Sequence, residues 1–309
     1  MHQQTRSSQS LAVAITKSAS KQTYITIRLF ADRNRASDAF RAYAYFRWVD
    51  DILDAETRAY PEKKVFVDRQ DALLAACYRG ESRQDLCPQE QMLADLVRHD
   101  SDPTSGLYIY LRKMMDVMIF DVQRCGRVIS HTELSTYTHN LAVAVTEAMY
   151  YFIGHDDPSP DHEARYLAVT AAHIIHMLRD TLEDVANGYY NIPQEVLAAH
   201  AISPQEVENQ AYRAWICERV KLARELFKAG RICTAQVKNL RCRLAGFAYT
   251  ARFEWMLRTI ERDQYCIRAD YPERKSLKAG LWMGWSTIAS VISLPLIQSA
   301  ARKLETDIE

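Results

Sequence analysis

Two clusters of acidic residues could do chemistry in this sequence, because each lies inside a strongly apolar stretch. The first is DDILD at 50–54 and the second is DTLED at 180–184. On a helix, residues four apart share one face, so the first and last aspartates of each cluster would lie together. Like charges at this spacing repel, and partial burial strengthens the repulsion. Carboxylates gathered against this cost typically hold divalent cations, and oxygen ligands favour Mg²⁺, with Mn²⁺ as the alternative. The expected metal ligands are Asp50, Asp51, Asp54, Asp180, Glu183 and Asp184.

An arginine accompanies each acidic cluster. Arg47 precedes Asp50 by three residues, and Arg179 directly precedes Asp180. The guanidinium fork matches phosphate oxygens in a bidentate manner, so these side chains are candidates for binding a phosphorylated substrate. The alternative is a salt bridge within the helix, which would make each cluster a solvated acidic face.

The composition excludes several classes of function. Lys and Arg total 39 and Asp and Glu total 39, so the net charge of zero argues against nucleic-acid binding. The 7 cysteines include no C-x-x-C pair, which argues against structural zinc and a disulfide framework and favours a reducing compartment. The polar start and the short apolar run LAVAI at 11–15 do not resemble a signal peptide. A cytoplasmic location is expected.

The pattern of apolar residues predicts an all-α protein. Only 9 glycines and 9 prolines occur in 309 residues, and no alternating strand pattern persists. Residues 1–18 are expected to form a flexible tail, and 19–309 a single helical domain. The expected helices cover about 38–56, 62–79, 90–98, 106–125, 132–152, 164–186, 203–229 and 232–263. These helices would position both acidic clusters.

The most apolar stretch lies near the end of the sequence, at 281–297. Its 17 residues include Ser and Pro, so it is marginal as a membrane span. We expect a terminal helix packed on the domain, with peripheral membrane contact as the alternative.

The acidic motifs resemble those of the squalene/phytoene synthase family. FRWVDDILD at 46–54 is similar to the first aspartate-rich motif of that family, and MLRDTLEDVANGYYNIPQE at 177–195 is similar to the second and the segment after it. The resemblance implies an all-α, class I isoprenoid synthase fold with a central apolar cavity. It implies that Mg²⁺ held between the motifs grips a prenyl diphosphate, of the farnesyl or geranylgeranyl class, for head-to-head condensation. Lys21 lies near the position of a lysine in the first helix of that family, and Asp116 and Asp121 match another of its motifs loosely.

Several positions depart from the family pattern. His176 stands where the family has an asparagine that binds metal, and His139 stands where we align its catalytic tyrosine. Val143 and Thr146 stand where the family often has two glycines close to the reacting carbons, so bulkier side chains would reshape that region.

The sequence therefore predicts that the ionising half of the site is retained and the half that steers the cation is altered. The expected catalytic residues are Asp50, Asp54, Asp180, Asp184 and His139; Arg47, Arg179 and Lys21 would bind diphosphate, and His176 would join the metal ligands. The leading hypothesis is squalene/phytoene-synthase-like coupling of prenyl chains. The alternatives are a terpene cyclase, a prenyltransferase to a non-prenyl acceptor, or a catalytically silent assembly protein.

Overall fold

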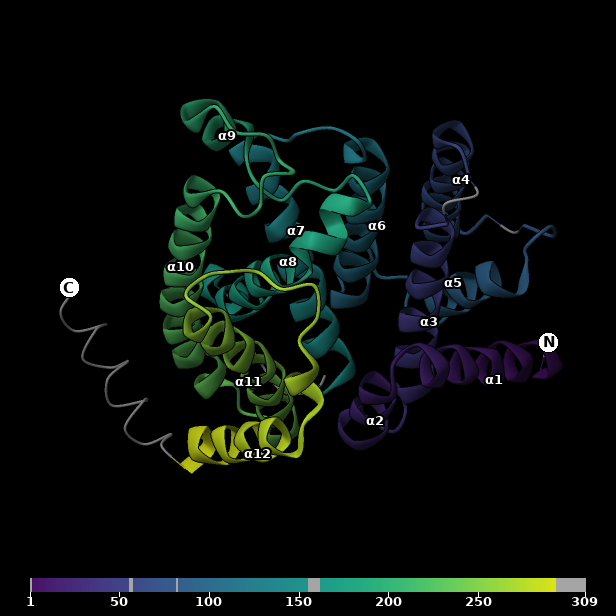
Figure 1. Cartoon of the computed structure of the whole chain (residues 1–309). Helices are drawn as coiled ribbons and strands as arrows, with labels where there is room; N and C mark the ends of the chain where they lie inside the picture. The colour runs from purple at the N-terminus through teal and green to yellow at the C-terminus, as the bar shows by residue number, and fades with distance from the viewer. Residues whose placement is uncertain (1, 56–57, 82, 155–161, 293–309) are drawn as a thin grey trace, which may run out of the picture. The chain divides into compact units, whose positions relative to one another are not determined.

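A computed structural model of the chain describes residues 2–55, 58–81, 83–154 and 162–292, without the side chains of residues 2–7. Within these ranges the regular structure is entirely helical (Figure 1), which confirms the all-α prediction. The α-helices are α1 His2–Ala19, α2 Lys21–Phe30, α3 Ala36–Leu53, α4 Tyr60–Tyr78, α5 Pro88–His99, α6 Gly106–Arg124, α7 His131–Phe152, α8 Leu167–Ala186, α9 Gln194–His200, α10 Gln210–Gln236, α11 Leu240–Arg262 and α12 Leu277–Ile292, with 3-10 turns at Glu163–Tyr166 and Pro272–Lys275.

The contacts divide the chain into two compact units that interleave along the sequence. The first unit comprises Met1–Gln123 and Val143–Asp156, and the second comprises Arg124–Ala142 and Asp157–Glu309. The acidic motif on α3 belongs to the first unit and the motif on α8 to the second. The single domain and its central cavity therefore stay predictions.

In the first unit, α3 packs against α1 and α5 (Figure 1). Tyr45, Phe46 and Val49 of α3 are buried, and the Tyr45 ring meets the Phe46 ring edge to face with centroids 5.0 Å apart. Packing of this buried face holds α3 in place. The C-terminal end of α3 carries Asp50, Asp51 and Asp54.

The prediction of a flexible tail at 1–18 is wrong, because α1 is a packed helix. Ser8, Ala12 and Thr16 are spaced four residues apart and are all buried. Residues at this spacing share one face, and their small side chains suit close packing against a neighbouring helix. The polar composition at the start of the sequence concealed this stripe of small residues.

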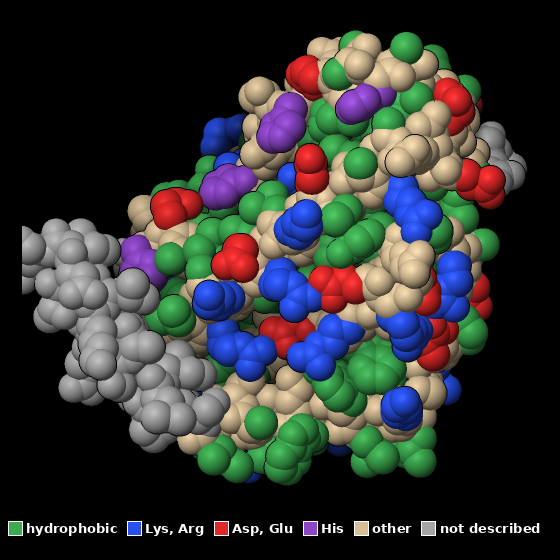
Figure 2. All heavy atoms as spheres, turned by 60° about the vertical axis from the view of Figure 1, so that its left-hand side comes forward, with side chains coloured by type: hydrophobic (Ala, Val, Ile, Leu, Met, Phe, Trp, Pro, Cys, Tyr) green, Lys and Arg blue, Asp and Glu red, His purple; other side chains and the backbone are tan. Residues whose placement is uncertain are grey.

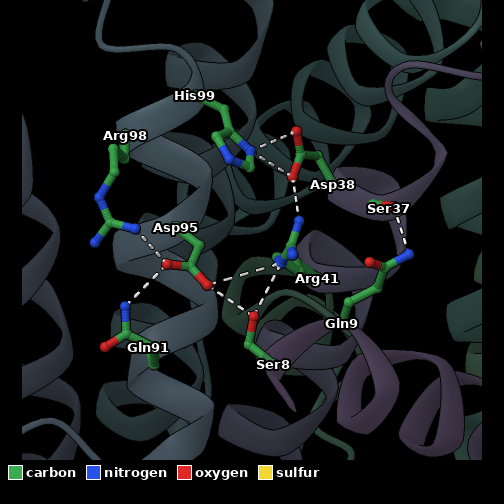
Figure 3. Close-up of polar contacts among 9 residues, drawn as sticks. All are labelled: Ser8, Gln9, Ser37, Asp38, Arg41, Gln91, Asp95, Arg98 and His99. Atoms are coloured by element: carbon green, nitrogen blue, oxygen red, sulfur yellow. Dashed lines mark hydrogen bonds and ion pairs between the residues drawn. The ribbon is translucent and has the colours of Figure 1, made fainter. Parts of the chain in front are cut away.

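A polar network ties α1 to α3 and α5 (Figure 3). Ser8 donates a hydrogen bond to Asp95 at 2.7 Å, and Arg41 donates to Ser8 at 3.2 Å and to Asp38 at 2.7 Å. The side chains of Arg41 and Asp95 are each 2% exposed. Buried charges are tolerated only when they are paired and hydrogen-bonded, and here Gln91 and Arg98 complete the shell of Asp95. The network shows why a serine that looked like part of a tail is a structural residue.

In the second unit, α8 packs against α10 and α11. α10 approaches α8 tightly at Gly230, where an added Cβ would lie 2.4 Å from the backbone nitrogen of Ala168. The sequence predicted a helix break near residues 230–231, but α10 continues through Gly230 to Gln236. Gly230 is therefore a packing residue and not a helix stop.

No helix among the described residues has both the length and the apolarity needed to cross a membrane. At the C-terminal end, α12 packs on α11 through Trp282, whose ring lies 5.5 Å from the Trp255 ring. The packed terminal helix is thus present as far as Ile292. The rest of the predicted apolar segment, 293–297, lies outside the described residues.

We predict that Gly230→Ala lowers the free energy of unfolding by about 3 kcal/mol, because the new methyl group would press on the backbone of α8. Gly280→Ala is the matched control, since nothing lies within 4 Å of a Cβ built at that helical glycine. That control is expected to be neutral or to gain up to about 1 kcal/mol from helix propensity. Urea titrations of both variants would check this, and equal stabilities would show that the α8–α10 approach tolerates a side chain.

Candidate active site

The first acidic motif lies at the C-terminal end of α3. The Arg47 guanidinium bridges two of its carboxylates, at 3.3 Å from Asp50 and 2.5 Å from Asp51. The backbone N–H of Asp54 donates to the carbonyl of Asp50 at 2.8 Å and closes the last helical turn. Arg47 thus forms the salt bridges within the helix that the sequence analysis gave as the alternative, and its role in binding diphosphate stays a prediction.

The charge of this cluster is only partly compensated. Burial, and next the neighbouring carboxylate of Asp54, raise the pKa of Asp50 to about 7, although Arg47 acts in the opposite direction. Burial and the carboxylate of Asp121 likewise raise the pKa of Asp54. Asp121 comes from α6 and acts on both motif residues, so packing adds a fourth carboxylate to the cluster. Such accumulation of negative charge favours protonation or a bound cation.

The second acidic motif is in a different electrostatic state. Asp180 accepts a hydrogen bond from Nε2 of His176 at 3.0 Å and another from Nε of Arg179 at 2.6 Å. Burial opposes ionisation of Asp180, but these two donors outweigh it and hold its pKa well below the usual range. Asp180 is therefore a stable carboxylate, and Nε2 of His176 is already engaged by it.

Asp184, one turn further along α8, is held by a separate chain of polar contacts. Nδ2 of Asn191 donates to Asp184 at 2.7 Å, and Nη1 of Arg124 donates to Oδ1 of Asn191 at 2.8 Å. The buried Arg124 guanidinium lies over the rings of Tyr137 and Tyr189, at 4.5 Å and 5.0 Å from their centroids. These contacts fix the orientation of Asp184. The segment that follows the motif therefore contributes to the site, because it supplies Asn191 and Tyr189.

Arginines that the sequence analysis did not identify lie near the second motif. The Arg252 guanidinium of α11 lies 4.5 Å from the Phe253 ring centroid, and the positive charges of Arg179 and Arg274 act on it. Burial lowers the pKa of Arg252, which marks a guanidinium held away from bulk water. A group of cationic side chains around Arg179 suits a polyanionic ligand such as a diphosphate. The only signal in the sequence was a basic residue inside the apolar run GFAYTARFEWML at 246–257.

The remaining predicted site residues are placed as follows. His139 is exposed on α7 and meets the Tyr166 ring edge to face at 5.9 Å. Lys21 is exposed at the start of α2, and Glu183 is exposed on α8. Val143 and Thr146 are buried on α7. The roles predicted for these side chains stay predictions, as does the sharing of metal ions between the two motifs, which lie in different units.

Two solved structures share this fold. The squalene synthase HpnC from Alicyclobacillus acidocaldarius superposes with a TM-score of 0.67 and 19% sequence identity, over 85% of this chain and 97% of that one. A dehydrosqualene synthase in complex with a ligand superposes with a TM-score of 0.67 and 14% identity, over 97% of this chain and 99% of that one. The fold is thus that of all-α squalene and dehydrosqualene synthases.

The sequence places the chain within one family of that fold. The profile of the squalene/phytoene synthase family matches residues 16–279, which include both acidic motifs and the helices around them. The chain belongs to the squalene/phytoene synthase family. No curated protein matches the sequence significantly.

The raised pKa of Asp50 predicts how stability depends on pH when divalent cations are absent. The unfolded carboxyl titrates near 3.8 and the folded one near 7, so the folded state binds the extra proton between these values. The contribution of Asp50 to stability should therefore fall as pH rises from about 4 to about 7, while the buried His173, whose pKa burial lowers to about 3, contributes in the opposite direction below about pH 6.5. Asp50→Asn should remove this component and raise the melting temperature at pH 8.

The matched control for this prediction is Asp51→Asn, since Asp51 lies in the same turn and its side chain is 52% exposed. Melting curves from pH 5 to pH 8 in a chelating buffer would compare the two variants with the parent. A melting temperature at pH 8 that Asp50→Asn lowers or leaves unchanged would contradict the strained carboxylate cluster.

Proposed function

We propose that this chain ionises an allylic prenyl diphosphate, releases diphosphate and couples the prenyl cation head to head with a second prenyl diphosphate. The single observation that carries the proposal is the burial and crowding of carboxylates that raise the pKa values of Asp50 and Asp54 in a chain of this family. Substrates of the farnesyl or geranylgeranyl class fit the family, and the assay described below would determine the length of the prenyl chain.

The donor chemistry of the first motif fits Mg²⁺, with Mn²⁺ as the alternative. Asp50, Asp54 and Asp121 offer hard carboxylate oxygens, and their mutual repulsion would be relieved by a divalent ion. Across the described ranges, no three His, Cys, Asp or Glu side chains converge into a ready metal cage. Mg²⁺ is usually bound by one or two carboxylates together with waters and substrate phosphates, so a full cage is not needed. When bound, the ion would offset charge on the leaving diphosphate.

The cationic side chains of the second unit support the binding of diphosphate. Arg179 and the half-buried Arg252 present guanidinium groups, and Arg274 adds to the same positive field. Guanidinium groups placed where negative charge develops stabilise a leaving diphosphate electrostatically. Arg47 has the same chemistry at the first motif. We propose these residues as the diphosphate-binding groups, with Lys21 as a further candidate.

The residues around the reacting carbons are expected to set the product. A prenyl cation is consumed by water, so ionisation requires apolar surroundings and benefits from ring faces. Val143 and Thr146 replace the small residues that the family often has, and His139 replaces its tyrosine. We propose that these substitutions alter how the cation is captured, which keeps a terpene cyclase and a prenyltransferase to another acceptor open as variants of the same chemistry.

One observation favours a second candidate, a catalytically silent assembly protein. His176 and Arg179 already neutralise Asp180, so this carboxylate has less need of a cation than Asp50. A family member that had lost catalysis could keep such a paired aspartate for stability alone. The two candidates differ in whether diphosphate is released.

We predict that the purified chain with Mg²⁺ releases diphosphate from farnesyl or geranylgeranyl diphosphate. Asp50→Asn and Asp180→Asn should each lower the rate by about 100-fold or more, because each would weaken charge stabilisation of the leaving group. The control is Asp68→Asn, an equal change of charge at an exposed aspartate paired with Lys64. A coupled phosphate assay would follow release, and mass spectrometry would identify the product.

The silent candidate makes the opposite prediction for the same proteins. If the chain is silent, no diphosphate is released from farnesyl or geranylgeranyl diphosphate with Mg²⁺ or Mn²⁺. The two aspartate variants would then differ from the parent only in stability. That result would remove the enzymatic proposal.

A further inference from the structure

One cation of the second unit, Arg219 of α10, is not used by the proposed reaction. Its side chain is half-buried, and across the described residues no hydrogen bond or ion pair reaches its guanidinium. The ring of Trp215, one turn earlier, stabilises the charge weakly, because its centroid lies 6.0 Å from the guanidinium. Arginine does not lose its proton in proteins, so this positive charge stays partly buried and uncompensated.

The other arginines of α10 have partners. Arg213, Arg224 and Arg231 share one face of the helix, which is turned toward α11 and the turn after it. Arg219 lies roughly 120° to 140° around the helix from this set, on another side. Figure 2 brings forward the side on which α10 lies in Figure 1, and shows Lys and Arg interspersed with Asp and Glu there. The partners are the backbone carbonyl of Gln264 at 2.6 Å for Arg213, Glu261 for Arg224, and Glu254 at 2.5 Å for Arg231.

The surroundings of Arg219 are apolar. Burial lowers the pKa of Arg219, and in the described part of the chain no charged group shifts that pKa further, so the acidic motif of α8 does not neutralise it. Trp215 and Leu222 lie four and three residues away, on the same side of the helix. Trp215 is 8% exposed, whereas Leu222 is 42% exposed. A charge held among apolar groups is unfavourable unless an anion pairs with it.

We propose that Arg219 binds a small monocarboxylate whose apolar body lies against Trp215 and Leu222. The planar guanidinium fork matches the two oxygens of a carboxylate. One carboxylate neutralises one guanidinium, whereas a phosphate dianion would leave a negative charge among apolar side chains. Sites for small ligands typically combine such a placed charge with an apolar lining, which the ring and the exposed leucine supply here. This site does not depend on the reaction proposed above.

Calorimetric titration of the full chain with hexanoate, without Mg²⁺ or prenyl diphosphate, tests the proposal. We expect saturable binding that is at least about tenfold weaker in Arg219→Gln, because a charge-assisted bidentate pair is lost. Arg219→Lys keeps the charge without the fork, so its affinity should fall between those of the parent and Arg219→Gln. The matched control is Lys221→Gln, which removes one positive charge from an exposed position of the same helix and should bind as the parent does.

Acetate and phosphate identify the class of ligand. Acetate lacks the apolar body, so it should bind more weakly than hexanoate, and Leu222→Ser should narrow that difference. Phosphate should bind more weakly than hexanoate, because its second charge stays unpaired. Circular dichroism would verify that all variants are folded.

Melting temperatures report on the uncompensated charge itself. Without any ligand, Arg219→Met should raise the melting temperature at pH 7, because it removes a partly buried charge and keeps an apolar side chain of similar length. Hexanoate should raise the melting temperature of the parent but not that of Arg219→Met, since a ligand stabilises only the folded state that binds it.

Three results would overturn the proposal. The first is no saturable binding of hexanoate by the parent, and the second is equal binding by Arg219→Gln. The third is phosphate that binds more tightly than hexanoate and is lost in Arg219→Gln, since the site would then be one for phosphate. Neither metal nor prenyl diphosphate is present, so these results are independent of whether the chain releases diphosphate.

Discussion

The repulsion among carboxylates at the end of α3 is the physical constraint on which the proposed chemistry depends. Asp50 and Asp54 lie on one helix face, and α6 adds Asp121, while Arg47 offsets only part of the charge. Packing in the first unit maintains this arrangement, because the buried aromatic face of α3 fixes where its last turn ends. Folding thus holds together groups that would separate in water, and a cation or a proton is the means of relieving the strain.

The two acidic motifs resemble each other in sequence but differ in what they require. Asp180 is satisfied by a histidine and an arginine, and Asp184 is oriented through Asn191, so the α8 motif is stable as it stands. The α3 motif is not stable in this way, because burial and neighbouring carboxylates raise the pKa values of Asp50 and Asp54. If the chain is an enzyme, this difference predicts that the first motif dominates the demand for metal, whereas the second motif and its arginines mainly hold the anionic leaving group.

Much of this could be predicted from the sequence, because it follows from local spacing. The all-α class, the helix that ends with DDILD and the pairing of Arg47 with the aspartates beside it all depend on residues within one or two turns. The sequence analysis gave Asp121 only as a loose match to a family motif and did not identify Arg252, because their places in the sites depend on packing between helices far apart in the chain. The structural role of Ser8 was missed for the same reason, because it depends on a hydrogen bond to Asp95, 87 residues away. The expected helices 203–229 and 232–263 left a break at Gly230, because the close neighbour of this glycine, Ala168, is also remote in the sequence.

The interleaving of the two units has a consequence for synthesis on the ribosome. Every residue of the first unit has been made once position 156 is reached, so this unit can fold while most of the second is still unsynthesised. Residues 124–142, by contrast, must wait for α8 and the segment after it to emerge before Arg124 can form its contacts with Asn191 and Tyr189. During that interval the first half of α7 lacks the rest of its own unit, so it is a segment of the nascent chain that a chaperone would protect.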